Sequence, residues 1–369
     1  MLNIALHRVL SEPNWKLKAL GVVLVMSLFR AFPSYDAFRT EFVQMTWRHA
    51  QAKVDDPLLD TGRTFPPESH ESKLTFRLTV PVLAHVLRLR LTGTMIVFGL
   101  AGIALLYSVL KIAHLATGSR KVALFVSLAT ACTWPGLAAF HELRGGYYDA
   151  FALCLLLLAL SASSPLSTAM LVFLAAWTDE RALIASPFIA FFAMTKDSNG
   201  LRSFLLGKPG AVVAAFVAYA GTRAYLTAAH SLVFTTGGVG PAVLRQQLNV
   251  IPLGIWTGLG GGWLIVGRSF LELWGQKRGV LTAGFLSLLG LMIIGSLSVI
   301  DVTRSMAYCL PAVLVGLRVL SQSQPAKNIE RLAALSAAVS FIAPTYYIEG
   351  SMGRWWLYPL PVQLVRWLS

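Results

Sequence analysis

Long apolar runs recur along the whole chain, and they constrain its fold more than any other feature. Runs such as Leu17–Phe32, Leu91–Leu115 and Val280–Ile300 approach the length of about 20 residues that crosses a hydrocarbon core. Hydrophobic residues make up 56% of the chain and charged residues only 13%, outside the usual range of soluble domains. A segment in lipid must satisfy its own backbone hydrogen bonds, so these runs are predicted to be helices.

The polar breaks between the runs predict an all-α fold, a polytopic transmembrane bundle of about ten or eleven helices in a single membrane domain. Crossings are expected near 17–32, 91–115, 121–141, 149–163, 165–178, 182–195, 209–228, 249–267, 279–300, 304–321 and 331–348. The stretch of about residues 33–90 forms a long first outer loop, in which Leu74–Arg90 resembles an amphipathic helix at the membrane interface. The glycines at Gly258–Gly262 lack the context of a phosphate loop and indicate close helix packing or a re-entrant turn.

Lysine and arginine are distributed unequally between alternate short loops, which predicts the orientation. One set of loops holds Arg8, Lys16, Lys18, Arg120, Lys121, Lys196, Arg202, Lys208, Arg268, Lys277, Arg278, Lys327 and Arg331. The opposite short loops hold only Arg144, Arg181, Arg245, Arg304 and Arg354, with Arg223 close to a boundary. We expect the first set and the amino terminus to be cytoplasmic, in a multi-pass protein of the plasma (inner) membrane. Topology then explains much of the net charge of +14, and no nucleic-acid partner is expected.

Most of the acidic residues fall at the predicted outer ends of the helices. Several of them belong to compact polar groups at residues 141–149, 178–181 and 301–304, each of which joins carboxylate to arginine. Such groups suggest either structural ion pairs or a site that handles phosphate in a cavity that opens outward. The predicted substrate-binding residues are Arg77, His141, Glu142, Arg144, Tyr147, Tyr148, Asp179, Glu180, Arg181, Asp301 and Arg304. Ordinary hydrated loops are the alternative interpretation.

Asp36 is singled out by its position directly after the first crossing, in the stretch SYDAF. It could cap a following helix, act as a catalytic base, or do both. Asp149 is the second catalytic candidate. A divalent ion could lie between Asp36, Asp149 and Asp179, although no ligand spacing requires a metal.

An acidic residue after the first crossing, a long outer loop with an interfacial helix and about eleven crossings together resemble the GT-C superfamily of membrane glycosyltransferases. The resemblance implies a polyprenyl-phosphate sugar donor, used at the outer face, with Asp36 as catalytic base or acceptor-orienting residue. The chain departs from the family pattern because no second acidic residue directly follows Asp36; Glu41 is the next.

The residue types suit this chemistry independently of the family. Glycosyl transfer from a lipid phosphate needs a base for the acceptor hydroxyl and positive charge for the departing phosphate. A transporter or flippase for a lipid-linked or polar substrate is the main alternative, since charges at membrane depth and Gly-rich helices also mark permeation paths. An accessory subunit without catalysis is the third interpretation.

Overall fold

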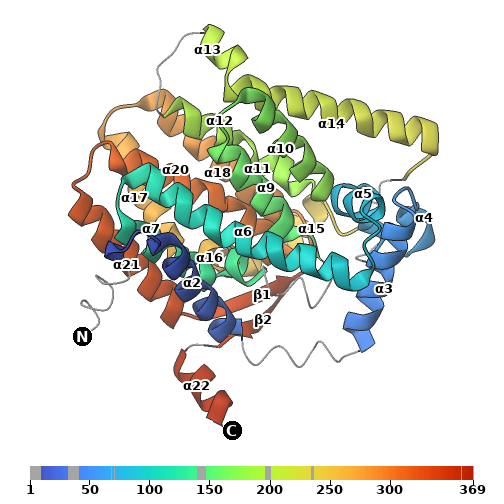
Figure 1. Ribbon diagram of the computed structural model, residues 1–369, viewed down its shortest axis with the longest axis horizontal. Coiled ribbons are helices and arrows are strands. Elements are labelled where there is room, and N and C mark those ends of the chain that lie inside the picture. The colour runs from blue at the N-terminus through green and yellow to red at the C-terminus, as the bar shows by residue number, and fades with distance from the viewer. Residues whose placement is uncertain are drawn as a thin grey trace.

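The part of the chain that the structure describes is mostly helical, with one small β-hairpin. The structure, a computed structural model, describes residues 10–31, 41–67, 69, 71–138, 147–195, 201–233, 237–358 and 360–368. Its α-helices not detailed below are α2 (Trp15–Ala31), α7 (Arg120–Ala131), α9 (Asp149–Ser161), α10 (Pro165–Thr178), α11 (Arg181–Ala185), α12 (Pro187–Met194), α13 (Leu201–Leu206), α15 (Pro241–Gln246) and α22 (Leu360–Leu368). Figure 1 shows most of them gathered into one bundle, with α13 and α22 projecting from it. The predicted helical class is thereby confirmed.

Four helices in the described part of the chain are long and apolar enough to cross a membrane. They are α6 (Leu91–Thr117), α14 (Lys208–His230), α18 (Gly279–Leu297) and the continuous stretch Val302–Ser321, which joins α19 (Val302–Met306), η4 (Ala307–Cys309) and α20 (Leu310–Ser321). The helices at the other predicted crossings are shorter or interrupted; α11 and α12, for example, are divided at Ser186, just before Pro187. The count of about ten or eleven crossings stays a prediction.

The predicted crossing 249–267 is not one straight helix. The segment η3–α16 (Leu248–Leu259) meets α17 (Gly262–Gly275) at an angle of 94°. Gly260 has a φ of +51°, which glycine adopts without steric cost, and a Cβ on Gly261 would overlap the carbonyl oxygen of Ser336. Glycine thus permits both the bend and the close approach of the neighbouring α21 (Ala326–Ile342), which confirms the predicted close packing.

The predicted crossing 331–348 also needs correction, because α21 ends at Ile342. Pro344 disfavours helical backbone at Ala343, which is extended with φ −71° and ψ 153°. Strand β1 (Thr345–Glu349) follows and pairs antiparallel with β2 (Met352–Leu357) around a turn at Gly350, whose φ is +61°. The run Thr-Tyr-Tyr-Ile is apolar enough to extend a predicted crossing, yet its β-branched and aromatic residues favour a strand.

The predicted first outer loop folds into short helices beside one end of the bundle. These are α3 (Glu41–Asp55), α4 (Thr61–Thr64), η2 (Glu71–Leu74) and α5 (Thr79–Val86), and Figure 1 shows α3, α4 and α5 beside the first half of α6. Trp47 packs edge-on against Phe98 of α6, with ring centroids 5.5 Å apart. Helix α5 covers part of the predicted amphipathic stretch; its place at a membrane interface stays a prediction.

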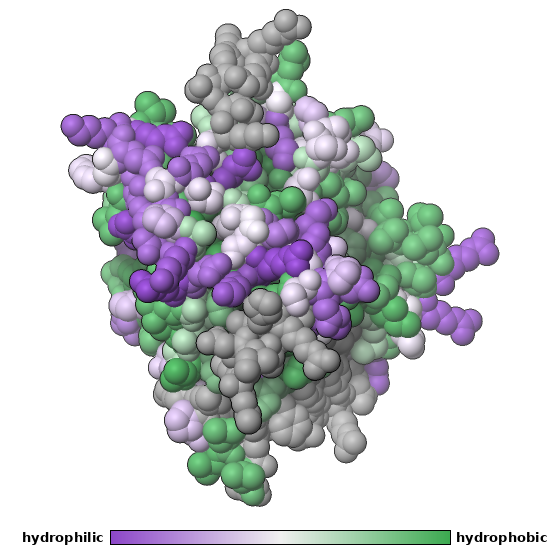
Figure 2. All heavy atoms as spheres, turned by 60° about the vertical axis from the view of Figure 1, so that its left-hand side comes forward, coloured by the Kyte–Doolittle hydropathy of each residue, from purple (hydrophilic) through white to green (hydrophobic). Residues whose placement is uncertain are grey.

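The bundle has two polar ends, named here by one residue each. At the Asp149 end α9 begins and α10 stops. At the Glu330 end, Glu330 of α21 accepts a hydrogen bond from Ser119 at 2.8 Å and pairs with Lys121 at 3.9 Å. Figure 2 brings forward the left-hand side of Figure 1 and shows a broad band of hydrophilic residues there, between hydrophobic flanks.

Candidate functional site

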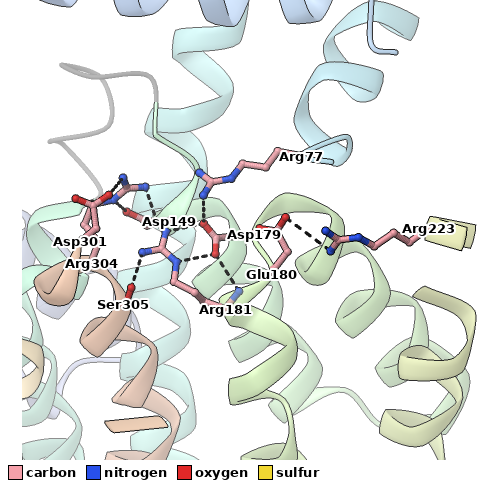
Figure 3. A network of polar contacts seen from close by, with 9 residues as sticks. All are labelled: Arg77, Asp149, Asp179, Glu180, Arg181, Arg223, Asp301, Arg304 and Ser305. Carbon is pink, nitrogen blue, oxygen red and sulfur yellow. Dashed lines mark hydrogen bonds and ion pairs between the residues drawn. The ribbon is translucent and has the colours of Figure 1, made fainter. Parts of the chain in front are cut away.

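Six charged side chains from four separate parts of the chain meet at the Asp149 end (Figure 3). We call them the ion cluster: Arg77, Asp149, Asp179, Arg181, Asp301 and Arg304. Each lies at or next to the end of a helix: Arg77 precedes α5, Asp149 opens α9, Asp179 caps α10, Arg181 opens α11, and Asp301 caps α19 with Arg304 inside it. Helix ends bring these charges to one level of the bundle, although they are far apart in sequence.

Asp149 is the centre of the ion cluster. It is fully buried, and one oxygen, Oδ2, accepts from Nε of Arg304 at 2.6 Å. Its other oxygen, Oδ1, accepts from Nη2 of Arg304 at 3.1 Å and from Nη2 of Arg181 at 2.5 Å. Charge-assisted bonds of this length satisfy both oxygens of a carboxylate that would otherwise be costly to bury. This geometry favours a positioning role for Asp149.

Asp179 joins the first loop to the helices. It is 1% exposed, and it accepts from Nε and Nη2 of Arg181 at 2.7 Å and 2.6 Å. Arg77 reaches its Oδ2 with Nη2 at 3.2 Å. Burial alone would raise the pKa of Asp179, but the attraction of Arg181 and Arg77 outweighs it and holds that pKa far below its usual range. Asp179 is therefore ionised at neutral pH.

Asp301 forms the more open edge of the ion cluster. It accepts from Nη1 of Arg304 at 2.9 Å and from the hydroxyl of Tyr347 in β1 at 3.0 Å. Burial opposes ionisation, but Arg304 and other nearby cations lower the pKa of Asp301. Lys73 is one of these cations, and its own pKa is lowered first by burial, with Asp301 acting in the opposite direction. The guanidinium of Arg304 also lies 4.0 Å from the ring centroid of Tyr147.

The three arginines differ in how fully their donors are used. Every nitrogen of Arg304 donates to a carboxylate, and those of Arg181 donate to Asp149, Asp179 and Ser305. By contrast, Nε and Nη1 of Arg77 are buried and have no partner among the described residues. The hydroxyl of Tyr308 is also buried and has no hydrogen-bond partner among the described residues; the ring centroid of Tyr308 lies 5.1 Å from the guanidinium of Arg181. Such unsatisfied groups cost about 1–3 kcal/mol each, so a ligand or water that accepts from Arg77 would be stabilised here.

The structure brings together many of the residues that the sequence predicts for the site. Arg77, Asp149, Asp179, Arg181, Asp301 and Arg304 form the ion cluster, and Tyr147 stacks on it. Glu180 instead pairs with Arg223 at 4.0 Å, and Tyr148 stacks on Phe98 in the core beneath the first loop. Asp36, His141, Glu142 and Arg144 lie outside the described residues.

Sequence reasoning missed several members of the surroundings, namely Lys73, Ser305, Tyr308 and Tyr347. Tyr308 follows Arg304 by one helical turn, a spacing that could have identified it. Lys73 and Tyr347 carry no comparable signal, because they reach the ion cluster only through the folding of the first loop and the β-hairpin.

Metal binding is a separate question. In the described ranges no group of three or more His, Cys, Asp or Glu residues is placed to hold a metal ion. The oxygens of Asp149 and Asp179 accept from guanidinium groups, which occupies the lone pairs that a cation would use. The predicted divalent site also involves Asp36, which lies outside the described residues.

No protein-family model matches the chain, and neither a curated protein nor a solved structure shows significant similarity to it. The resemblance to GT-C glycosyltransferases therefore rests on the pattern around Asp36 and on the predicted topology. Among the residues described, the ion cluster is the strongest lead to function.

Proposed function

We propose that the protein is an integral membrane glycosyltransferase that takes a sugar from a polyprenyl-phosphate donor at the extracytoplasmic face, where the Asp149 end lies. The observation that supports this most is the buried guanidinium of Arg77, with two unsatisfied donors. Lys73 lies beside the three arginines and three carboxylates of the ion cluster, and the two open donors of Arg77 can receive an anion. A lipid phosphate at a membrane surface matches that chemistry.

The transfer step assigns a role to each group. The acceptor hydroxyl attacks the anomeric carbon as the bond from that carbon to the phosphate oxygen breaks. Asp36 takes the hydroxyl proton, and the lipid phosphate leaves with the electron pair of the broken bond. The open N–H groups of Arg77 donate to the oxygens on which negative charge grows, which lowers the barrier. Arg181 and Arg304 are saturated, so they hold the site in shape together with Asp149.

Asp36 is the leading catalytic carboxylate in this proposal. In sequence it lies between α2 and α3, at the start of the predicted first outer loop, which also contains Arg77. Asp149 was the other catalytic candidate, but both of its oxygens accept from arginines, which leaves it poorly placed to take a proton.

Cysteine labelling tests the orientation. Ser351→Cys, in the exposed β-hairpin turn at the Asp149 end, should react with a membrane-impermeant maleimide in intact cells. Ser323→Cys, exposed at the Glu330 end, should react only after the cells are opened. The native Cys132, Cys154 and Cys309 are buried and provide a low background. The reverse pattern would place the ion cluster in the cytoplasm and remove the proposed donor site.

Arg77→Gln tests the donor site itself. In vesicles with a polyprenyl-phosphate sugar, we expect the KM for the donor to rise about tenfold or more, because one charged contact to phosphate is lost. Arg63→Gln is the matched control, since Arg63 lies in the same loop with its side chain 61% exposed. Equal donor KM values for wild type and Arg77→Gln would exclude Arg77 from donor binding. Absence of transfer by the wild type with any polyprenyl-phosphate sugar would count against the enzyme.

A transporter or flippase is the second candidate, favoured by the 94° bend between α16 and α17. Broken helices with freed backbone groups are typical of transporter binding sites. Analysis of the substrate after incubation with vesicles distinguishes the two functions. A transporter would move its substrate across the vesicle membrane with every glycosidic bond intact, whereas the enzyme would release polyprenyl phosphate.

A further inference from the structure

A hollow of about 360 Å³ lies at the Glu330 end of the bundle, and none of its lining residues belongs to the ion cluster. It is bounded by α17, α20 and α21. The side chains that matter for its chemistry are Arg268, Leu320, Ile329, Arg331, Leu332 and Leu335. Gln324 and Asn328 complete the lining, which therefore joins four apolar side chains to two amides and two guanidinium groups. Such a mixed lining suits an amphiphile with an anionic headgroup.

The polarity of the hollow changes along the helix axes. On α21, which begins at the Glu330 end, Arg331 comes first and Leu335, 52% exposed, lies one turn deeper. On α17, which runs toward the same end, Arg268 lines the hollow about two turns before the helix ends at Gly275. The two cations therefore lie toward the end of the bundle and Leu335 lies deeper, the order of headgroup and acyl chain in a lipid.

Arg268 and Arg331 both have guanidinium N–H groups that can donate to a ligand. Arg331 is exposed and has no charged partner among the described residues. Arg268 reaches Glu272 only through Nη2, at 3.4 Å. Glu272 also accepts from Gln276 at 2.9 Å and from Gln324 at 2.7 Å, so Arg268 shares this carboxylate with two amides. Lys327, one turn before Arg331 on α21, adds further positive charge.

We propose that this hollow binds an anionic phospholipid of the cytoplasmic leaflet. Arg268 and Arg331 contact its phosphate, and the start of one acyl chain lies against Leu332 and Leu335. Basic pockets between membrane helices on the cytoplasmic side are suited to anionic headgroups. The proposal depends on the membrane placement of the helices and on their orientation, but not on glycosyl transfer.

Native mass spectrometry of the purified protein, titrated with phosphatidylglycerol in detergent, tests the site. We expect Arg268→Gln combined with Arg331→Gln to weaken lipid binding at least about tenfold, since two direct charged contacts to the phosphate are lost. The matched control is Lys18→Gln with Lys277→Gln, which removes the same charge from exposed positions at the same end. This control should change binding about twofold or less.

A second variant separates the pocket from its charge. Leu332→Trp keeps both arginines but fills the space for the acyl chain, and it should weaken binding as strongly as the double variant. Phosphatidylcholine should bind less tightly than phosphatidylglycerol, and glycerol phosphate, which lacks acyl chains, should not compete. Equal losses in the double variant and its control would show diffuse attraction and overturn the proposal. Unchanged binding in Leu332→Trp, or competition by glycerol phosphate, would also overturn it.

Discussion

Replacing Asp149 by alanine is expected to lower the free energy of unfolding by about 3–5 kcal/mol, because two buried guanidinium groups lose their shared partner. Arg304 is 1% exposed and keeps only Asp301, while Arg181 keeps Asp179. The side chain of Arg181 is 15% exposed, so Arg304 is the arginine that loses most. Unfolding followed in mixed detergent micelles, by tryptophan fluorescence, measures the loss.

Two companion variants show whether charge is the cause. Glu180→Gln lies next to Asp179 but at the partly exposed pair with Arg223, so it should cost less than about 1 kcal/mol. Asp149→Leu combined with Arg304→Leu removes one anion and one cation together, and it should recover at least half of the loss. If the double variant were as unstable as Asp149→Ala, packing at this site would be the explanation instead of unpaired charge.

Replacing Asp36 by asparagine is expected to reduce glycosyl transfer about 10²-fold or more, the scale of losing a general base. Asparagine keeps the shape of the side chain and much of its helix-capping ability, so folding should persist. Turnover with a lipid-linked sugar, measured beside circular dichroism and binding of the donor, separates chemistry from structure.

Asp55→Asn is the control for this experiment. It makes the same chemical change at the end of α3, where the carboxylate is exposed and bonded to Gln51 at 2.8 Å. Transfer should remain within about twofold of wild type, as for ordinary surface substitutions. Full activity in Asp36→Asn would remove Asp36 from the mechanism and return attention to Asp149, despite its bonds to two arginines.

Helical periodicity and composition predict much of this fold. They do not predict the positions where contacts with distant parts of the chain determine the backbone conformation. The run at 165–178 matches α10, since Ser164 caps it with a hydrogen bond to Ser167 and Asp179 ends it. The run through Thr345–Ile348 is equally apolar yet forms a strand, because Pro344 stops the helix. The glycines at Gly258–Gly262 indicated close packing or a turn, but not the partner, because Gly261 lies against the Ser336 carbonyl of another helix and no local pattern contains that contact.

The candidate site, too, could be predicted from the sequence only in part. Carboxylates and arginines at predicted helix ends were recognisable in the sequence, and Asp149, Asp179 and Arg304 lie in one network of ion pairs. Their convergence with Asp36 on one cavity stays a prediction. The sequence could not tell which arginine keeps open donors. That depends on how three carboxylates are shared among three guanidinium groups in space, and within the described part of the chain Arg77 forms one ion pair, with Asp179 at 3.2 Å.

The shared bonds of Asp149 also bear on how this protein can change over generations. A mutation that neutralises Asp149 removes a carboxylate partner from both Arg181 and Arg304. A mutation that neutralises Arg304 removes a cationic partner from both Asp149 and Asp301, so either single substitution is destabilising. Descendants should therefore inherit these positions together or exchange them in opposite-charge pairs. Arg77, held by one contact, has more freedom to vary, unless a ligand constrains it. Close retention of Arg77 among relatives would then reflect selection by whatever the protein binds.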